Sequence, residues 1–260
     1  MKLVIVALLL ASCGAPAQTT KATEPPTTTE AKPVTVPANI QATIDAADRD
    51  ADDRALDAGR HPGEMLAFFG IGPGMTVADL AAGRGYTTEL LARTVGDTGK
   101  VYAENSKLLL GFVGDDWTKR LAKPVLKNVV RVDRELEDPL PPEAKNLDAV
   151  VMVLFYHDTY WQKTDRAKMN AAILAALKPG GVYGIVDHSA RAGAGSNDVK
   201  TFHRIEQSEL VSDVTKAGFK LVGEASFLRN PSDSRDWNDS PREAGSRRGT
   251  SDRFVLKFVK

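Results

Sequence analysis

The sequence has a single cysteine, no excess of either charge and no apolar run long enough to cross a membrane. Because Cys13 is the only cysteine, an intramolecular disulfide and a cysteine-built metal site are excluded. The 260 residues carry 34 basic and 34 acidic side chains, so the positive excess typical of nucleic-acid binding is missing. We therefore expect no nucleic acid among the partners. With 42% apolar residues, the composition is that of one globular, enzyme-sized domain.

The apolar run near the start, Leu3 to Leu10, follows a positive Lys2. It is far shorter than the roughly 20 residues of a membrane-spanning helix, so it predicts an export signal. The sequence Leu10-Ala11-Ser12-Cys13 resembles the lipobox of bacterial lipoproteins, in which the cysteine is lipidated and becomes the first mature residue. The resemblance implies a signal peptide at 1–12 and an exported protein anchored by its lipid at the cell envelope, with Gly14 favouring the periplasmic face of the outer membrane. An ordinary secretory signal with a chance cysteine is the alternative.

The segment after Cys13 is rich in Thr, Pro and Ala. Between Gly14 and Asn39, seven of the 26 residues are Thr, five are Pro and five are Ala. Such a stretch buries too little apolar surface to offset the entropy lost on ordering. We therefore expect a disordered tether at 13–39 and a folded domain at 40–260.

Short apolar runs then alternate with helical patterns, which is typical of a parallel sheet covered by helices. The acidic, alanine-rich segment 42–57 predicts a solvated helix, and Pro62 lies at an expected first helical position. We expect strands at 76–80, 100–104, 129–132, 148–154, 181–186, 219–225 and 254–259, and helices at 87–94, 109–121, 166–177 and 205–217. The long connection 229–252 is either functional or disordered. Trp237 in it favours an ordered lid.

A turn of small residues, Ala81-Ala82-Gly83-Arg84-Gly85-Tyr86, follows the first strand. Small residues let the chain turn tightly and let a ligand approach main-chain N–H groups at the start of a helix. Glu104 ends the second strand, 19 residues after Gly85. A carboxylate at that place can accept hydrogen bonds from both hydroxyls of a ribose, so the pattern predicts a nucleoside site.

The run from Asp79 to Gly85 resembles the first motif of the class I S-adenosylmethionine-dependent methyltransferases, with Ala81 where that family usually has its first glycine. Leu177-Lys178-Pro179-Gly180-Gly181 and Ala217-Gly218-Phe219 are similar to further motifs of its small-molecule enzymes. A dinucleotide-binding Rossmann domain is the nearest competitor. Its third glycine would fall at Tyr86, where there is none.

The resemblance covers about residues 40–260 and implies a three-layer, Rossmann-like α/β fold that ends in an antiparallel strand pair. It also implies S-adenosylmethionine as cofactor. The cofactor-binding residues it implies are Asp79, Gly83 and Gly85 at the methionine end, Ala81 and Tyr86 in the same turn, Glu104 at the ribose and Asp133 at the adenine edge.

Three of the four histidines lie at or after predicted strand ends. Because the carboxyl ends of parallel strands meet at one edge of a sheet, we expect these histidines and their neighbours to converge there. The catalytic candidates are His157, Asp158, Asp187, His188, His203 and Arg204. In this interpretation His157 or His188 is a general base, Asp158 or Asp187 fixes its tautomer, and Arg204 is a carboxylate clamp.

Two other roles for these polar residues stay open. They either cap loops or hold a divalent metal, since imidazole and carboxylate together suit zinc or iron. Neither His-Asp pair has the spacing of a helical zinc motif, so no metal is assigned.

The sequence therefore predicts S-adenosylmethionine-dependent methyl transfer to an unidentified small molecule by an exported, lipid-anchored enzyme. The alternative is an exported protein that keeps the fold without catalysis and binds a metal or small ligand through its histidines.

Overall fold

The computed structural model describes Met1 and residues 33–260. Cys13, the rest of the predicted signal peptide and the tether up to Lys32 lie outside the described residues. Within the described part, no helix has both the length and the apolarity needed to span a bilayer.

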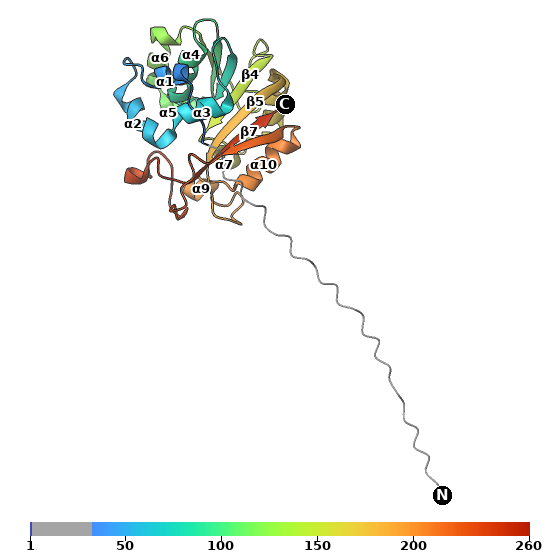
Figure 1. The fold of residues 1–260 in the computed structure, drawn as a ribbon. Helices are drawn as coiled ribbons and strands as arrows, with labels where there is room; N and C mark the ends of the chain where they lie inside the picture. The colour runs from blue at the N-terminus through green and yellow to red at the C-terminus, as the bar shows by residue number, and fades with distance from the viewer. Residues whose placement is uncertain (2–32) are drawn as a thin grey trace. The chain divides into compact units, whose positions relative to one another are not determined.

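The centre of the domain is a seven-stranded sheet in the order β3-β2-β1-β4-β5-β7-β6 (Figure 1). The strands are β1 (Thr76–Leu80), β2 (Lys100–Asn105), β3 (Val129–Asp133), β4 (Leu147–Val153), β5 (Leu177–His188), β6 (Lys220–Ala225) and β7 (Arg253–Val259). β1 to β5 are parallel, and β7 runs antiparallel to both β5 and β6. This topology confirms the predicted fold class and its C-terminal antiparallel pair.

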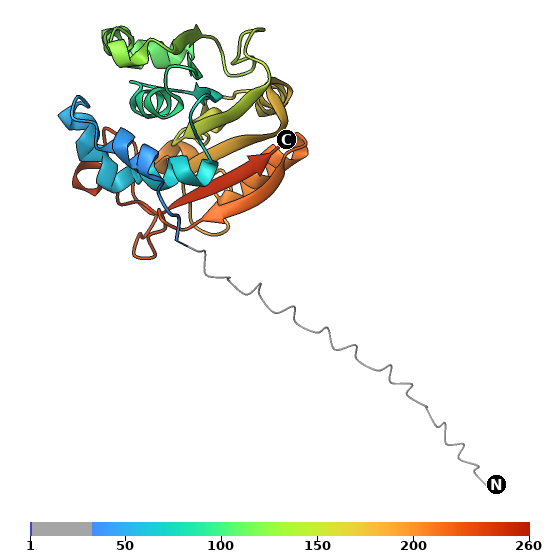
Figure 2. The same ribbon diagram turned by 45° about the horizontal axis from the view of Figure 1, so that its top comes forward.

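Both faces of the inner strands β1, β4 and β7 are largely buried, which explains why these strands read as continuous apolar runs rather than alternating ones. Successive residues of β1 enter different cores: Val77 joins one, and Ala78 and Leu80 join the other. On the Val77 side pack α1 (Ala38–Ile44), α3 (Pro62–Phe69) and α4 (Tyr86–Val95). On the opposite side pack α8 (Arg166–Ala176) and α10 (Gln207–Lys216) (Figures 1 and 2).

Two predicted helices are interrupted in the structure. The segment expected as one helix at 42–57 contains the end of α1 and most of α2 (Ala51–Arg60). The one expected at 109–121 is divided at Gly114 into α5 (Lys107–Val113) and α6 (Asp115–Leu121). Gly114 has a φ of 52° and ends α5, a position that favours glycine.

The acidic helix is also less solvated than expected. Asp53 of α2 is buried and lies 2.5 Å from Arg120 of α6, and Asp57 lies 2.7 Å from the buried Arg49. Its carboxylates therefore connect α2 to neighbouring segments through ion pairs, a role that the acidic composition alone did not indicate.

The first helix begins at Ala38, two residues before the predicted start of the domain, and Val34 and Val36 already pack against the core. The remaining short helices are η1 (Pro124–Leu126), α7 (Asp158–Trp161), α9 (Val199–Phe202) and η2 (Gly245–Arg247). α7 follows the carboxyl end of β4, and α9 lies in the connection after β5. These two helices carry or adjoin the candidate catalytic residues His157, Asp158, His203 and Arg204, and the end of β5 carries Asp187 and His188.

Candidate functional site

The glycine turn joins the end of β1 to the start of α4, as predicted. Three of its residues have left-handed backbones, with φ of 53° at Ala81, 59° at Gly83 and 83° at Gly85. This conformation strains residues that have a Cβ, so glycine is favoured at each of them and Ala81 is accommodated at a cost. A Cβ on Gly85 would also lie 2.8 Å from the buried Trp117 ring, so that position has no room for a side chain.

Several peptide nitrogens of this turn already have partners within the chain, which corrects in part the expectation that they are open to a ligand. Ala81 N–H donates to Glu104 Oε2 at 2.9 Å, and Gly83 N–H donates to Asn105 Oδ1 at 2.8 Å. Ala82 N–H donates to the Glu104 carbonyl at 2.8 Å. Glu104 and Asn105, at the end of the neighbouring strand β2, thus accept the hydrogen bonds of these three N–H groups.

Glu104 itself retains unused hydrogen-bonding capacity. Its side chain is fully buried, and Oε1 has no hydrogen-bond partner among the described residues. Burial raises the pKa of Glu104 to about 8, although the hydrogen bond from Ala81 favours the charged form. A buried polar atom without a partner is costly and rare in a folded protein. The orphaned oxygen at the predicted ribose position is therefore where a ligand hydroxyl could bind.

We expect Glu104 to make the protein less stable as the pH rises. The folded state holds the carboxyl proton up to about pH 8, whereas an unfolded chain releases it near the ordinary glutamate value of 4.5. Between these values the unfolded state binds fewer protons, so the free energy of unfolding falls, and above them the penalty is constant. Each pKa unit corresponds to about 1.4 kcal/mol, so the loss is roughly 3–5 kcal/mol.

Glu104→Gln removes this titration, so its free energy of unfolding should fall less than that of the wild type between pH 5 and 8. Urea denaturation at several pH values measures the difference, and Glu209→Gln, at an exposed position, is the matched control. Parallel pH profiles for the wild type and Glu104→Gln would contradict the assignment.

Asp79 and Tyr86 lie on the side of the turn nearest α2. Asp79 is buried and accepts a hydrogen bond from Thr88 at 2.6 Å, and burial raises its pKa to about 7 against the effects of Thr88 and the Arg60 charge. The Tyr86 hydroxyl donates to Asp57 at 2.7 Å. The Arg60 guanidinium lies 4.4 Å from the centre of the Tyr86 ring. Asp79 and Arg60, whose ionised side chains have opposite charges, thus lie near the methionine end predicted for the cofactor.

A narrow pocket lies between these N-terminal helices and the carboxyl edge of the sheet. It is lined by Arg60, Pro62, Met65, Tyr86, Thr87, Val153, Leu154, Val186, Leu228 and Arg253. Its volume is about 10 Å³, room for about one water molecule. A larger ligand at this place therefore requires the lining side chains to move apart.

Asp133, predicted at the adenine edge, ends β3 beside the end of β2, where it pairs with Asn105 in the sheet register. Its carboxylate lies 2.8 Å from Arg131 Nε and is well exposed. The structure therefore places Asp133 beside Asn105, one residue beyond Glu104, but shows its carboxylate engaged with Arg131 on the same strand.

The predicted histidine cluster forms at the carboxyl ends of β4 and β5. His157 Nδ1 lies 2.7 Å from Asp187 Oδ1, and the His157 main-chain N–H donates to Asp187 Oδ2 at 2.8 Å. Both side chains are almost completely buried. Asp187 therefore fixes the ring of His157, the orienting role predicted for one of the two aspartates.

The other nitrogen of His157 meets two further candidates. Nε2 lies 3.2 Å from Asp158 Oδ1 and 3.2 Å from His203 Nδ1, and the last two atoms are 3.1 Å apart. Burial would lower the pKa of His157, but the carboxylates of Asp187 and Asp158 raise it to about 10. Nε2 is enclosed by Asp158 and His203, and the role of His157 or His188 as a general base stays a prediction.

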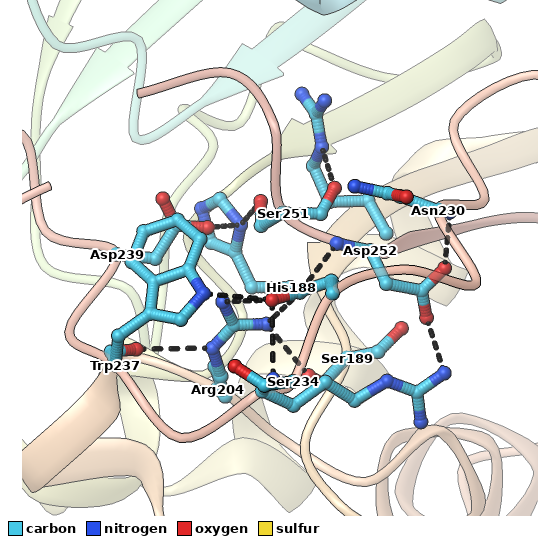
Figure 3. A network of polar contacts seen from close by, with 12 residues as sticks. His188, Ser189, Arg204, Asn230, Ser234, Trp237, Asp239, Ser251 and Asp252 are labelled. Atoms are coloured by element: carbon cyan, nitrogen blue, oxygen red, sulfur yellow. Dashed lines mark hydrogen bonds and ion pairs between the residues drawn. The ribbon is translucent and has the colours of Figure 1, made fainter. Parts of the chain in front are cut away.

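His188 is near this cluster but has different partners (Figure 3). Its ring centre is 5.6 Å from that of His157. Its Nδ1 lies 3.0 Å from Ser251 Oγ and 2.5 Å from Asp239 Oδ2. Burial lowers the pKa of His188, although Asp239 acts in the opposite direction.

Arg204 has a structural role, which corrects its prediction as a clamp for a ligand carboxylate. It is fully buried, and its guanidinium lies 2.7 Å from Asp233 Oδ2. It also donates to the carbonyls of Ser189 and Trp237 and lies 4.6 Å from the centre of the Trp237 ring (Figure 3). The carboxylate it binds belongs to the chain itself, and the long connection 229–252 is folded around it.

The sequence did not indicate several residues of the site. Asn105 directly follows Glu104, and its polarity next to a predicted ligand residue was a usable signal. Asp233 and Asp239 lie in the long connection, where nothing in the spacing distinguishes them from solvated acids. Arg60 precedes Pro62 by two residues and gave no signal of its place over Tyr86.

Comparisons with known proteins relate this chain to methyltransferases. No family model matches it. It is 30% identical over 134 residues to the ubiquinone/menaquinone biosynthesis C-methyltransferase UbiE of Idiomarina loihiensis, across 52% of this chain and 51% of that protein. The chain thus spans about half the length of the curated relatives it matches.

Solved structures match over more of the chain. An S-adenosylmethionine-dependent methyltransferase from Aquifex aeolicus gives a TM-score of 0.54 at 21% identity, covering 76% of this chain and 88% of that chain. The glycopeptide N-methyltransferase MtfA, solved with sinefungin, gives a TM-score of 0.53 at 17% identity, covering 77% and 85%. At these identities the likeness establishes the fold.

Proposed function

We propose that this chain is a class I S-adenosylmethionine-dependent methyltransferase, which binds S-adenosylmethionine and transfers its methyl group to a small molecule. The observation that carries the proposal is the buried, unpartnered oxygen of Glu104 at the end of β2. This is the position at which a ribose hydroxyl finds an acceptor in folds of this type.

The residues around the glycine turn fit the cofactor. Glu104 Oε1 would accept a hydrogen bond from a ribose hydroxyl. The ionised form of Asp79 and the Arg60 guanidinium have opposite charges, which match the ammonium and carboxylate groups of a methionine moiety. When bound, the cofactor supplies an electrophilic methyl group on a sulfonium. The chain's part is to orient the acceptor in line with that methyl group and to exclude water.

We place the acceptor beside the histidine cluster at the ends of β4 and β5. β4 lies next to β1 in the sheet and β5 lies next to β4, all three parallel, so the cluster and the turn are on the same edge. Among His157, Asp158 and His203, the side chain of His203 is the most exposed, at 24%. An acceptor oxygen or carbon would therefore reach the cluster from the side of His203. The cluster would assist the loss of the acceptor's proton.

Methyl-labelled S-adenosylmethionine tests catalysis directly. The whole chain, incubated with the labelled cofactor and a small-molecule extract, should move label to an extractable product, and Glu104→Ala should not. Cofactor binding without any such transfer would favour the alternative, a binding protein that retains the fold.

We also propose that the chain is exported and lipidated at Cys13, because a short apolar run precedes a lipobox-like sequence. In a bacterial host, the wild type should enter the membrane fraction with a diacylglycerol mass on its N-terminal cysteine. Cys13→Ser should remain without that mass. Membrane association of the Cys13→Ser variant equal to the wild type would overturn the lipid anchor.

A further inference from the structure

The side chains of His157, Asp158 and His203 bring three metal-ligating atoms together. The atoms are His157 Nε2, Asp158 Oδ1 and His203 Nδ1, and their mutual separations are 3.2, 3.2 and 3.1 Å. They form a compact triangle. Ligand atoms at about 2.0–2.2 Å from one ion lie roughly 2.8–3.6 Å apart in octahedral or tetrahedral geometry. The triangle therefore already has the dimensions of one face of a metal coordination sphere.

We propose that this triangle, which we call the His-Asp-His face, binds a divalent transition-metal ion such as Zn²⁺, Fe²⁺, Mn²⁺ or Co²⁺. Two imidazoles and one carboxylate on one face form the ligand set preferred by these ions, and they leave further coordination positions open. Because this set contains no thiolate, the single cysteine of the sequence does not argue against it.

The surroundings of the His-Asp-His face support a metal ion. His157 Nδ1 lies 2.7 Å from Asp187 Oδ1, which holds the ring so that Nε2 faces the other two ligand atoms, and a bound metal ion would take the place of the Nε2 proton. A carboxylate behind a ligating histidine in this way orients the ring and raises its basicity in metal sites. The Trp161 indole N–H donates to Asp158 Oδ1 at 2.6 Å and orients the second ligand. Asp158 and Asp187 together balance a charge of +2.

The burial of the three ligands also suits a bound ion with an accessible side. The side chains of His157 and Asp158 are 3% and 16% exposed, whereas that of His203 is 24% exposed. Surface acids that gather without a function are usually well solvated, and these are not. The open coordination positions would accept an oxygen of water or substrate and lower its pKa. This last role, unlike metal binding itself, depends on the proposed function.

Metal titration of the whole chain tests the proposal, with Co²⁺ as spectroscopic probe and Zn²⁺ for calorimetry after removal of bound metal by chelator. The wild type should bind one ion per chain, with the visible absorption of Co²⁺ in a low-symmetry nitrogen and oxygen site. His203→Ala and Asp158→Asn should each weaken binding by about tenfold or more. His61→Ala, which removes a histidine outside the cluster, should bind as the wild type does.

Circular dichroism of each variant checks that it folds, and His203→Ala, at a partly exposed position, keeps the test available if Asp158→Asn does not fold. Absence of binding to the wild type, or equal binding by folded His203→Ala, would overturn the metal site. S-adenosylhomocysteine binding is measured on the same samples. Metal binding without cofactor binding would contradict the proposed function alone, and the reverse result would contradict the metal site alone.

Discussion

Replacing Glu104 by alanine is expected to weaken S-adenosylhomocysteine binding by about 10- to 100-fold. Glu104→Ala leaves a buried ribose hydroxyl without its partner, which costs about 1–3 kcal/mol, and this loss accounts for the range. The structure supports a large effect because Glu104 is fully buried and its Oε1 has no other partner among the described residues. Equilibrium dialysis or calorimetry with the whole chain gives the dissociation constants.

Glu209→Gln is the control for this measurement because it changes an exposed glutamate on α10, across the sheet from α4. Its affinity for S-adenosylhomocysteine should equal that of the wild type. An affinity of folded Glu104→Ala within about twofold of the wild type would show that Glu104 does not bind the ribose.

The second large effect is expected at Arg204. Its pairing with Asp233 is fully buried, with side-chain exposures of 0% and 1%. Arg204→Met leaves the Asp233 carboxylate buried without its cation, and such a change typically costs about 3–5 kcal/mol. Asp233 also accepts from the Trp237 indole at 2.7 Å and from the Asp252 N–H at 2.7 Å. We therefore expect Arg204→Met to destabilise the connection 229–252 most strongly.

Urea denaturation and amide hydrogen exchange together measure this effect. Arg191→Met is the matched control, because Arg191 pairs with Asp198 while its side chain is 52% exposed, and it should cost less than about 1 kcal/mol. The double variant Arg204→Met with Asp233→Asn should recover part of the loss. Equal stability of Arg204→Met and Arg191→Met would contradict the structural role assigned to Arg204.

The sheet could be predicted from the sequence because its signals are local. β1 lies at its predicted residues, 76–80. A strand buried on both faces gives a short apolar run, and this run can be recognised without knowing which strands pair with it. Helix interruptions were harder to predict. The helical pattern of 109–121 continues across Gly114, and only the backbone at that residue shows that α5 ends there.

The site was predicted in part for a related reason. Parallel topology brings strand ends together, so His157, Asp187 and Glu104 could be assigned to one edge from their positions after strands. Which atoms they meet depends on segments distant in sequence. Arg204 and Asp233 are 29 residues apart, and the meeting of His157 with His203 spans 46. No spacing rule connects such pairs, so Arg204 was assigned to a ligand instead of to the chain.

Calorimetric titration of the whole chain with S-adenosylhomocysteine tests the central claim most directly. A nucleoside whose ribose reaches the orphaned oxygen of Glu104 should bind at one saturable site, and Glu104→Ala should reduce its affinity as described above. No binding to the folded wild type up to about 1 mM ligand, an affinity weaker than about −4 kcal/mol, would contradict the account.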